Sequence, residues 1–311
     1  MDYQILTYRT ASGEAAAGVL VRNSVYNVAS LAGLAHCRTV IDILNDWWHT
    51  EKLLQEAAKA IDASAAVGLP LDDLELLAPI PNPSAVYCCG ANYTDHINEM
   101  RPLLKNLPRD IPERELVGDE PWHFVSTVRG SIVGPGTSVP KPHGSRQLDW
   151  EIEMVAVIGA TARCVPVENA LEHVAGYTIA NDLSARDLST RSEVHEGIPF
   201  RVDWTAHKCF DGSLPCGPWI TPASQISDPQ RLDLKLWVND KLMQNSNTGQ
   251  MVYTVAQQIA KLSINKTLYP GDMILTGTPA GVGAGRGVFL NSGDKVRMAI
   301  GGIGELRHSI A

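Results

Sequence analysis

Residues 149–158 read DWEIEMVAVI, and this stretch has the pattern of a buried β-strand. Side chains in a strand alternate between its two faces, so Glu151 and Glu153 share one face while the residues between them occupy the other. The apolar run from Met154 to Ala160 favours burial of the whole strand. Two carboxylates about 7 Å apart in such a place need a cation or a proton beside them, and a divalent metal ion meets that need. The alternative is an exposed edge strand whose glutamates are solvated.

A third carboxylate strengthens the metal interpretation. Asp182 follows a short apolar strand expected at Tyr177–Ala180, where a loop begins and a ligand could be aimed inward. Two glutamates and one aspartate are hard oxygen ligands, which suit Mg²⁺, Mn²⁺ or Ca²⁺ rather than Zn²⁺. Three protein ligands on an octahedral ion leave positions for water and for a bidentate substrate. The three acids therefore predict a catalytic metal site, with Mg²⁺ as the first candidate.

Strands and turns dominate the sequence beyond residue 84. We expect strands in short aliphatic or β-branched segments bounded by Gly, Pro, Asn or Asp, at 85–89, 150–158, 177–180, 232–238, 272–275 and 295–300. The clearest helices are expected at Val167–Val174 and Met251–Leu262. Turn residues at Asn239–Asp240, Pro270 and Ser292 favour antiparallel pairing over repeated βαβ units. These patterns predict an α+β fold that is mostly β.

A proline-rich segment divides the chain. Residues 78–84 read APIPNPS, which disfavours helix and sheet and favours an extended connector. With 311 residues the chain is long enough for about two domains. We therefore expect a small N-terminal α+β domain at 1–78 and a larger domain at 79–311 that carries the chemical motifs. In the small domain, strands are expected at Tyr3–Tyr8 and Gly18–Val28 and a helix at Val40–Ala60.

Composition and charge argue against several classes of protein. With 44% apolar and 19% charged residues, the chain is expected to be neither disordered nor a coiled coil. A net charge of -8 argues against nucleic acid and anionic lipid as partners. The first residues lack the pattern of a signal peptide, and no apolar run approaches the roughly 20 residues that span a bilayer, so we expect a cytoplasmic protein without a membrane partner. The six cysteines form no CxxC pair and are expected to be reduced.

The segment GANYTDHINEM, residues 90–100, contains a candidate general base. On a short helix, His96 and Glu99 would be neighbours at positions i and i+3. A histidine oriented by a carboxylate can accept a proton from a reacting group. A surface helix that shows this spacing by chance is the alternative.

Two further polar features could contact a substrate. In TGTPAGVG, residues 276–283, small side chains are expected to leave backbone N–H groups and the Thr278 hydroxyl free to hold a carboxylate. This motif lacks the Gly-Lys-Ser/Thr ending of a phosphate-binding loop. Lys208 is the remaining candidate cation. A plain glycine-rich turn and a solvated lysine are the respective alternatives.

Several of these segments occur in the order typical of the fumarylacetoacetate hydrolase family, which the chain resembles over about residues 78–311. The matching segments are GANYTDHINEM, LDWEIEMVAVIG, GYTIANDLSARDL, KCFDGSLPCGPWI and PGDMILTGTPAGVG. The resemblance implies a C-terminal mixed β-sandwich roll behind a small N-terminal α+β domain. It also implies a homodimer formed through the C-terminal domain.

The resemblance further implies a role for each candidate residue. The implied metal ligands are Glu151, Glu153 and Asp182. The implied catalytic residues are His96 and Glu99, which activate water, and Lys208, which contacts the oxyanion. The implied substrate contacts are Arg186, Thr278, Gly277 and Tyr93. For Arg186, a structural ion pair is the alternative.

The family's usual substrate is a 2,4-dioxo acid, an acylpyruvate such as fumarylpyruvate. The resemblance therefore implies a metal-dependent hydrolase that cleaves a C–C bond to give pyruvate and a carboxylic acid, in aromatic or sugar-acid catabolism. An oxaloacetate-type decarboxylase and a 2-hydroxy-dienoate isomerase are alternatives on the same scaffold, because fold and metal do not decide the reaction. A non-catalytic protein that binds metal or sugar acids is a more remote alternative.

Two long stretches, Arg101–Val128 and Ser189–Lys208, are expected to be irregular and to border the site. We expect the first to act as a lid over bound substrate. In the second, Ser189 stands where many relatives carry glutamine, and the segment before Lys208 is longer than usual. His195 and Glu196 are candidate polar contacts there, with a solvated loop as the alternative.

Overall fold

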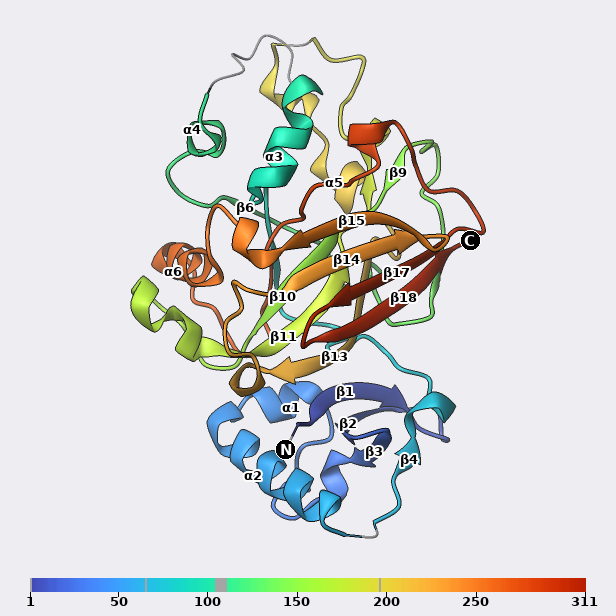
Figure 1. Ribbon diagram of the computed structural model, residues 1–311, viewed down its shortest axis with the longest axis vertical. Helices are drawn as coiled ribbons and strands as arrows, with labels where there is room; N and C mark the ends of the chain where they lie inside the picture. The colour runs from blue at the N-terminus through green and yellow to red at the C-terminus, as the bar shows by residue number, and fades with distance from the viewer. Residues whose placement is uncertain (1, 65, 104–110, 196) are drawn as a thin grey trace.

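The computed structural model describes residues 2–64, 66–103, 111–195 and 197–311. Figure 1 shows a small lobe, built from the first strands and helices of the chain, below a larger part that contains packed sheets. The N-terminus lies in the small lobe and the C-terminus at the edge of the larger part. The expected α+β, mostly β fold class is confirmed.

One long mixed sheet runs through both parts of the molecule. Its strands in spatial order are β4 (Leu69–Pro70), β3 (Ser24–Asn27), β2 (Ala15–Val21), β1 (Gln4–Arg9), β13 (Leu214–Pro222), β11 (Val174–Asn181), β10 (Ile152–Ile158), β16 (Met273–Leu275), β5 (Val86–Cys89) and β6 (His123–Val125), with β7 (Ile132–Val133) beside β13. Strand β1 pairs with β13 at Ile5 and Ile220, which joins the small lobe to the larger part. Neighbours are mostly antiparallel, as expected from the turns, but β16 pairs parallel with β5.

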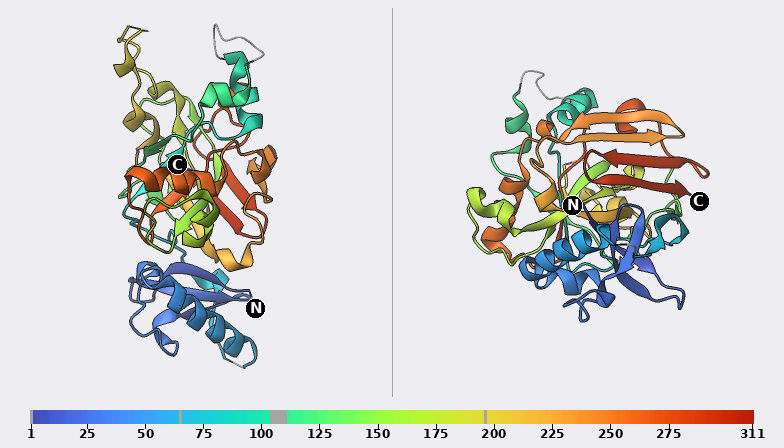
Figure 2. Two further views of the ribbon diagram at one scale, coloured as in Figure 1. Left: turned by 90° about the vertical axis from the view of Figure 1, so that its left-hand side faces the viewer. Right: turned by 60° about the horizontal axis from the view of Figure 1, so that its bottom comes forward.

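A second sheet covers one face of the first. Its strands in spatial order are β15 (Lys241–Asn247), β14 (Asp233–Val238), β17 (Lys295–Ile300), β18 (Gly304–Ile310) and β8 (Ser138–Val139). Figure 2 shows β14, β15, β17 and β18, in orange to red, side by side. Fully buried side chains such as Met154, Leu236 and Met298 from the two sheets form a shared apolar core. This is the mixed β-sandwich that the family resemblance implies.

Strand β10 shows how the sequence pattern positions the site. Its even-numbered residues from Ile152 to Ile158 are fully buried in the sandwich core. Val155 and Val157, on the opposite face, belong to a second core that includes residues of the small lobe. Glu153 lies on this second face because it is two residues before Val155. The strand is therefore buried on both faces, and the alternative of an exposed edge strand is wrong.

Helices lie around the sheets, and several begin at residues that cap them well. They are α1 (Val40–Leu44), α2 (Trp47–Asp62), α3 (Thr94–Met100), α4 (Glu113–Val117), α5 (Trp204–Lys208) and α6 (Val255–Asn265). Thr254 and Gln257 form a capping box, which explains why α6 begins at Val255 rather than at Met251. Across the described ranges, no helix has the length and apolar character that crossing a bilayer requires.

Other element boundaries differ from the sequence prediction for local reasons. The strand expected at Gly18–Val28 is divided into β2 and β3 by a turn in which Arg22 has a left-handed backbone, with φ 57°. The helix expected at Val40–Ala60 is divided into α1 and α2, because Asp46 between them has a non-helical backbone. A 3₁₀ helix over Val167–His173 replaces the α-helix expected there.

The two stretches expected to be irregular contain regular elements. Helix α4 and strand β6 lie within Arg101–Val128, and α5 ends the second stretch. Residues 104–110 of the expected lid, and Glu196, lie outside the described residues. The lid therefore stays a prediction.

The small lobe and the larger part share one apolar core. Trp47 of α2 is 2% exposed, and its indole lies so close to Gly159 that a Cβ at that position would come within 2.9 Å of it. Thr7 Oγ1 donates to the carbonyl of Pro79, which ties the proline-rich connector to β1. The domain boundary after residue 78 stays a prediction, since the core extends across it.

We expect the change Trp47→Ala to lower the free energy of unfolding by about 3–5 kcal/mol, because it leaves a large cavity in this shared core. Trp48, the next residue, is 49% exposed and provides a matched control. For Trp48→Ala we expect a loss of about 0.5 kcal/mol or less. Urea unfolding followed by circular dichroism measures both, and equal losses in the two variants would contradict the shared core.

Candidate active site

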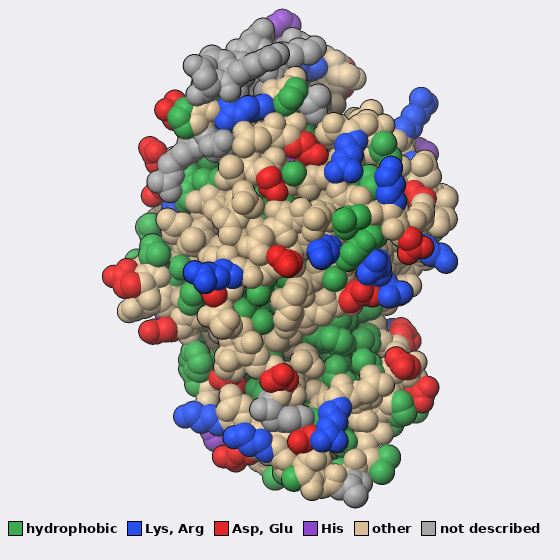
Figure 3. Space-filling view, viewed as in Figure 1, with side chains coloured by type: hydrophobic (Ala, Val, Ile, Leu, Met, Phe, Trp, Pro, Cys, Tyr) green, Lys and Arg blue, Asp and Glu red, His purple; other side chains and the backbone are tan. Residues whose placement is uncertain are grey.

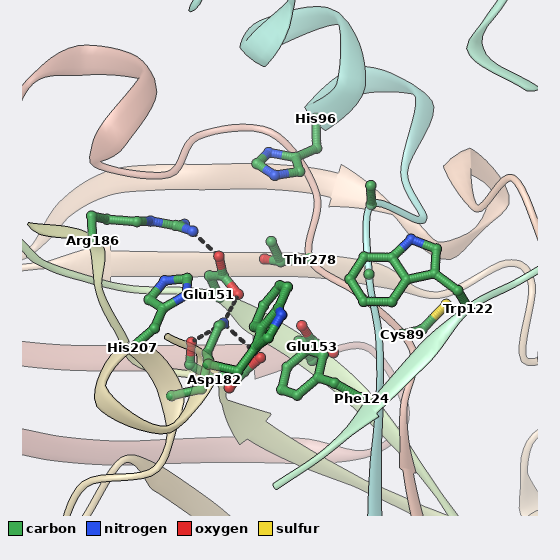
Figure 4. A pocket seen from close by; sticks show the side chains of 14 residues that line it. Cys89, His96, Trp122, Phe124, Glu151, Glu153, Asp182, Arg186, His207 and Thr278 are labelled. Carbon is green, nitrogen blue, oxygen red and sulfur yellow. Dashed lines mark hydrogen bonds and ion pairs between the residues drawn. The ribbon is translucent and has the colours of Figure 1, made fainter. Parts of the chain in front are cut away.

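A pocket with a volume of about 220 Å³ lies at the start of β10 and the end of β11. Figure 4 shows the side chains that line it. Seven residues predicted from the sequence are among them: His96, Glu151, Glu153, Asp182, Arg186, Lys208 and Thr278. Aromatic residues that the sequence analysis did not identify also line it: Trp122, Phe124, Trp204 and His207.

The three acids predicted as metal ligands come together because β10 and β11 are antiparallel neighbours. Ile152 near the start of β10 pairs with Asn181 at the end of β11, so Glu151 and Glu153 lie beside Asp182. One oxygen from each carboxylate lies within 4.8 Å of the others, and all three residues are buried.

Lys208 lies between two of these acids. Its Nζ donates to Glu151 Oε2 and Asp182 Oδ2, at 2.7 Å in each case, and to the Asp182 carbonyl at 3.1 Å. Helix α5 carries this lysine, and the lysine is buried. The alternative of a solvated lysine is therefore wrong.

Arg186 forms ion pairs on the other side of Glu151. Its Nε donates to Asp149 Oδ2 at 2.9 Å, and its Nη2 donates to Glu151 Oε1. Asp149 also accepts from the backbone N–H groups of Gly283 and Ala284. The structural ion pair weighed for Arg186 is therefore present, although the guanidinium also lines the pocket.

Burial and charge set the ionisation of the acids. Burial, together with the carboxylates of Asp182 and Glu151, raises the pKa of Glu153 well above its usual value. Burial also raises the pKa of Asp182 to about 6, although Lys208 opposes that shift. For Glu151, burial opposes ionisation, yet Lys208 and Arg186 hold its pKa below the usual value.

The cluster has an excess of negative charge. Within the described residues, the carboxylates of Asp149, Glu151, Glu153 and Asp182 are balanced by only Lys208 and Arg186, which leaves two negative charges when every group is ionised. A buried site tolerates such an excess poorly unless a cation is present. Three oxygen ligands and two uncompensated charges fit a divalent metal ion held by Glu151, Glu153 and Asp182.

His96 and Glu99 lie on α3. His96 Nδ1 is 3.5 Å from Glu99 Oε2, slightly longer than an ordinary hydrogen bond. Both Glu99 oxygens lie 3.0 Å from the Gly281 N–H, which holds the carboxylate in place. Burial opposes ionisation of Glu99, but His96 and this N–H together lower its pKa. Figure 4 shows the imidazole across the pocket from the acids. His96 and Glu99 are therefore placed as a candidate base and its orienting carboxylate, although no hydrogen bond joins them in this structure.

Several donors that the loop 276–283 was expected to leave free are occupied. The N–H of Gly277 donates to Glu153 Oε2, that of Ala280 to Asp95, and that of Gly281 to Glu99. The Thr278 hydroxyl donates to the Ile152 carbonyl and accepts from Gln244. Buried carboxylates require hydrogen-bond donors, and backbone N–H groups of this loop supply them. The loop thus positions protein acids, and Gly277 is not free to bind a substrate.

Tyr93 is also not a substrate contact in this structure. Its side chain is fully buried in the sandwich core, and it is absent from the described lining of the pocket. The adjacent Asn92 explains this position, because its side chain is hydrogen-bonded to the backbone of Tyr253 and Thr276 and holds the segment against the core. His195 is exposed and accepts from the Gly197 N–H, so its expected contact with the site is not seen.

Sequence reasoning missed Asp149, His207 and the aromatic residues of the pocket. Asp149 could have been noticed, since it begins the motif that contains both glutamates. Trp122 and Trp204 have no local signal, because they meet only through the fold.

A family model described as fumarylacetoacetate (FAA) hydrolase C-terminal matches residues 85–311. The chain is 39% identical over 262 residues to oxaloacetate tautomerase fahd2, mitochondrial, from Xenopus laevis, an alignment that covers 84% of this chain and 75% of the relative. The family expected from the sequence motifs is thereby confirmed.

Two solved structures are similar over nearly the whole chain. One is fumarylacetoacetate hydrolase from Exiguobacterium antarcticum, with a TM-score of 0.74 and 30% identity over 99% of both chains. The other is maleylpyruvate hydrolase from Sphingobium sp. SYK-6 in complex with manganese (II) ion and pyruvate, with a TM-score of 0.71 and 27% identity over 99% of this chain and 98% of that one.

The change Glu153→Gln tests the acid cluster. We expect it to weaken the binding of Mg²⁺ and Mn²⁺ by at least about 10- to 100-fold, the usual effect of losing even a group that supports a metal ligand. The Tm of the metal-free variant should remain close to that of the wild type, because an amide resembles the protonated carboxyl that burial favours here. Thermal unfolding and calorimetry with and without metal measure both effects.

Glu56→Gln on the exposed surface of α2 is the matched control and should bind metal as the wild type does. A Glu153→Gln protein with an unchanged metal-induced rise in Tm would rule out Glu153 as a ligand.

A hydrogen-bond chain behind Glu151 connects the two sheets. The Glu151 N–H donates to Asn181 Oδ1, and Asn181 Nδ2 lies 2.8 Å from His308 Nε2. Because Nδ2 can only donate, His308 Nε2 must accept and must be unprotonated. Burial lowers the pKa of His308 to about 4.

This neutral histidine predicts a loss of stability in acid. From about pH 6.5, where an unfolded histidine becomes protonated, down to about pH 4, the unfolded chain binds a proton that the folded protein does not. As the pH is lowered through this range, the contribution of His308 to the free energy of unfolding should therefore decrease by at most about 1.4 kcal/mol per pH unit. We measure the free energy of unfolding by urea at several pH values; its slope against pH reports how many more protons the unfolded chain binds. His308→Gln should lower that number by about one, and exposed His36→Gln should leave it unchanged. An unchanged slope in His308→Gln would contradict the neutral buried state.

Proposed function

The chain belongs to the fumarylacetoacetate hydrolase family, and we propose that it is a divalent-metal-dependent enzyme that hydrolyses the C–C bond of a 2,4-dioxo acid. The observation that carries this proposal is that His96, whose Nδ1 lies 3.5 Å from Glu99 Oε2, lines the same pocket as the three buried acids. A base opposite a metal site is what water activation requires. The products would be pyruvate and a carboxylic acid.

Glu151, Glu153 and Asp182 would hold the metal. When bound there, a divalent ion supplies a Lewis acid that polarises the carboxylate and 2-oxo oxygens of the substrate. Mg²⁺ is the ion we propose and Mn²⁺ the next, because three carboxylates are hard oxygen ligands. The manganese ion and pyruvate named for the Sphingobium structure support this choice of ion and of product.

The protein residues would carry the proton transfers. Glu99 orients the His96 imidazole, and His96 takes a proton from a water molecule as that water attacks the distal carbonyl carbon. The bond between this carbon and C3 then breaks, and its electron pair remains on C3 as the enolate of pyruvate. The buried ammonium of Lys208 stabilises the negative charge that develops. His96 returns its proton to C3, which gives pyruvate beside the released acid.

Keto–enol tautomerisation of an oxaloacetate-like acid is the second candidate. The name of the Xenopus laevis relative favours it, at 39% identity over 84% of this chain. The same base would move a proton between C3 and the enol oxygen, and no water would be consumed. Decarboxylation and dienoate isomerisation use related enolate chemistry and are outcomes of the same assay.

Three further expectations stay proposals. We propose a homodimer through the larger part of the chain, which sedimentation at low concentration tests. A small dioxo acid is the proposed partner, and charged side chains of both signs are interspersed on the face in Figure 3 rather than gathered into one basic area. A cytoplasmic location also stays a proposal, since the name of the Xenopus laevis relative includes the word mitochondrial.

An assay with acetylpyruvate tests the proposed hydrolysis. With Mg²⁺ we expect loss of the enol absorbance together with formation of acetate and pyruvate, and we expect EDTA to stop the reaction. His96→Ala should lower kcat by about 10²- to 10⁴-fold, the usual contribution of a general base. Exposed His36→Ala is the matched control and should retain activity.

A different result would select another reaction. If acetylpyruvate is untouched while the tautomers of oxaloacetate interconvert in a metal-dependent reaction, the tautomerase replaces the hydrolase. If oxaloacetate loses CO₂ in a reaction that survives His96→Ala, the decarboxylase does.

A further inference from the structure

One side of the pocket is formed by three aromatic rings from two distant segments. Trp122 and Phe124 come from the β6 segment, and Trp204 begins α5. Phe124 and Trp204 are stacked with ring centroids 5.0 Å apart, and Trp122 meets Trp204 edge-on at 5.7 Å. We call these three residues the aromatic wall. Figure 4 shows the Trp122 and Phe124 rings on the side of the pocket away from Arg186.

The aromatic wall is open to solvent although it is apolar. Trp122 is 41% exposed and Trp204 is 42% exposed, and both line the pocket. The absence of a side chain at Gly90 leaves room for the Trp122 indole, because a Cβ at Gly90 would lie 2.0 Å from that ring. Large apolar side chains grouped at a pocket in this way gain free energy when a ligand covers them.

The aromatic wall is continuous with the acid cluster. Lys208 Nζ lies 5.9 Å from the centre of the Phe124 ring, and the His207 ring lies 5.8 Å from that of Trp204. A ligand held at the three acids would therefore extend along the wall. The wall is thus placed to receive whatever group is attached to the 2-oxo acid.

His207 gives a second and independent sign that a ligand binds there. The residue is 7% exposed and lines the pocket, yet its Nε2 is buried without a hydrogen-bond partner among the described residues. Buried polar atoms are usually paired, so this nitrogen lacks a partner that a ligand can supply. A carbonyl oxygen at the junction of the acid cluster and the wall would do so.

The charges of the pocket argue against a second carboxylate as the group at the wall. The permanently charged cations in its described lining are Arg186 and Lys208, and both are already paired with carboxylates. A distal carboxylate would therefore meet apolar rings and no unpaired cation in this lining.

We propose that the aromatic wall is the subsite for the acyl group of the substrate and that it selects a flat, uncharged, conjugated or aromatic group. This inference rests on the proposed function only in taking the substrate to be a 2-oxo acid held at the three acids. It names the substrate class as 2,4-dioxo acids with an aromatic or conjugated acyl group.

Two ligands that cannot be hydrolysed test the subsite without reference to turnover. 2-Oxobutanoate and 2-oxo-4-phenylbutanoate share the 2-oxo acid group and lack the second oxo group, and they differ by a phenyl ring at the position of the acyl substituent. Calorimetry on the full chain with Mg²⁺ gives both dissociation constants. For the wild type we expect the phenyl ligand to bind about 10-fold tighter or more, the usual gain for burying a ring.

Variants on separate elements show whether this preference comes from the wall. Trp122→Ala and Trp204→Ala should each reduce the ratio of the two dissociation constants to about threefold or less, and Gly90→Ala, which displaces the indole of Trp122, should reduce it as well. Using the ratio within one variant cancels any general weakening of the site. Trp48→Ala, an exposed tryptophan of the small lobe, is the matched control and should keep the wild-type ratio.

The outcomes separate this proposal from the proposed function. A wild-type protein that binds neither ligand, or both equally, would overturn the subsite, as would a ratio that the wall variants leave unchanged. If the ratio behaves as expected but aromatic and aliphatic acylpyruvates are not cleaved, the subsite stands and the hydrolase is rejected. If acetylpyruvate is cleaved but the wild type shows no preference for the phenyl ligand, the hydrolase stands and the subsite is rejected.

Discussion

The structure depends on the burial of three carboxylates where a core strand begins. Glu151, Glu153 and Asp182 lie beside residues that are fully excluded from water, and charges in such a place are costly unless they are compensated. Lys208 and Arg186 compensate part of the charge through direct ion pairs. The remaining net charge of the cluster is negative. Without a cation this charge destabilises the site, and the same charge would attract a cation. The proposed affinity for a divalent metal ion would follow from how the chain folds.

The loop after β16 organises both halves of the candidate site. Gly277 donates to Glu153 in the acid cluster, and Gly281 donates to Glu99 beside the base. Both glycines have a left-handed backbone, with φ 91° and 106°, and a Cβ at Gly281 would lie 2.1 Å from the Met243 carbonyl. Glycine is therefore required where the loop approaches β15. One short loop thus sets the distance between the proposed metal ligands and the proposed base.

The pocket combines a charged side with an apolar one, and each side limits the chemistry. In the proposed function the acid cluster would hold the carboxylate and oxo groups of a 2-oxo acid through a metal ion, and the aromatic wall of Trp122, Phe124 and Trp204 would receive a flat uncharged group. His207 lies where the two sides meet. Relatives with the same scaffold are named for hydrolysis and for tautomerisation, so the reaction depends on these local groups rather than on the fold.

The sequence by itself determined the buried strand over Ile152–Ile158, the position of Glu151 and Glu153 at its start and the spacing of His96 and Glu99, because strand and helix periodicity follow from backbone geometry. It also determined the family, since the motifs occur in order along the chain. Only the tertiary structure decided that the N–H groups of the loop 276–283 bind the protein's own acids, that Tyr93 belongs to the core, and that Trp122 meets Trp204. Which donor meets which acceptor, and which rings touch, depends on strands and helices that are distant in the sequence and adjacent only after folding.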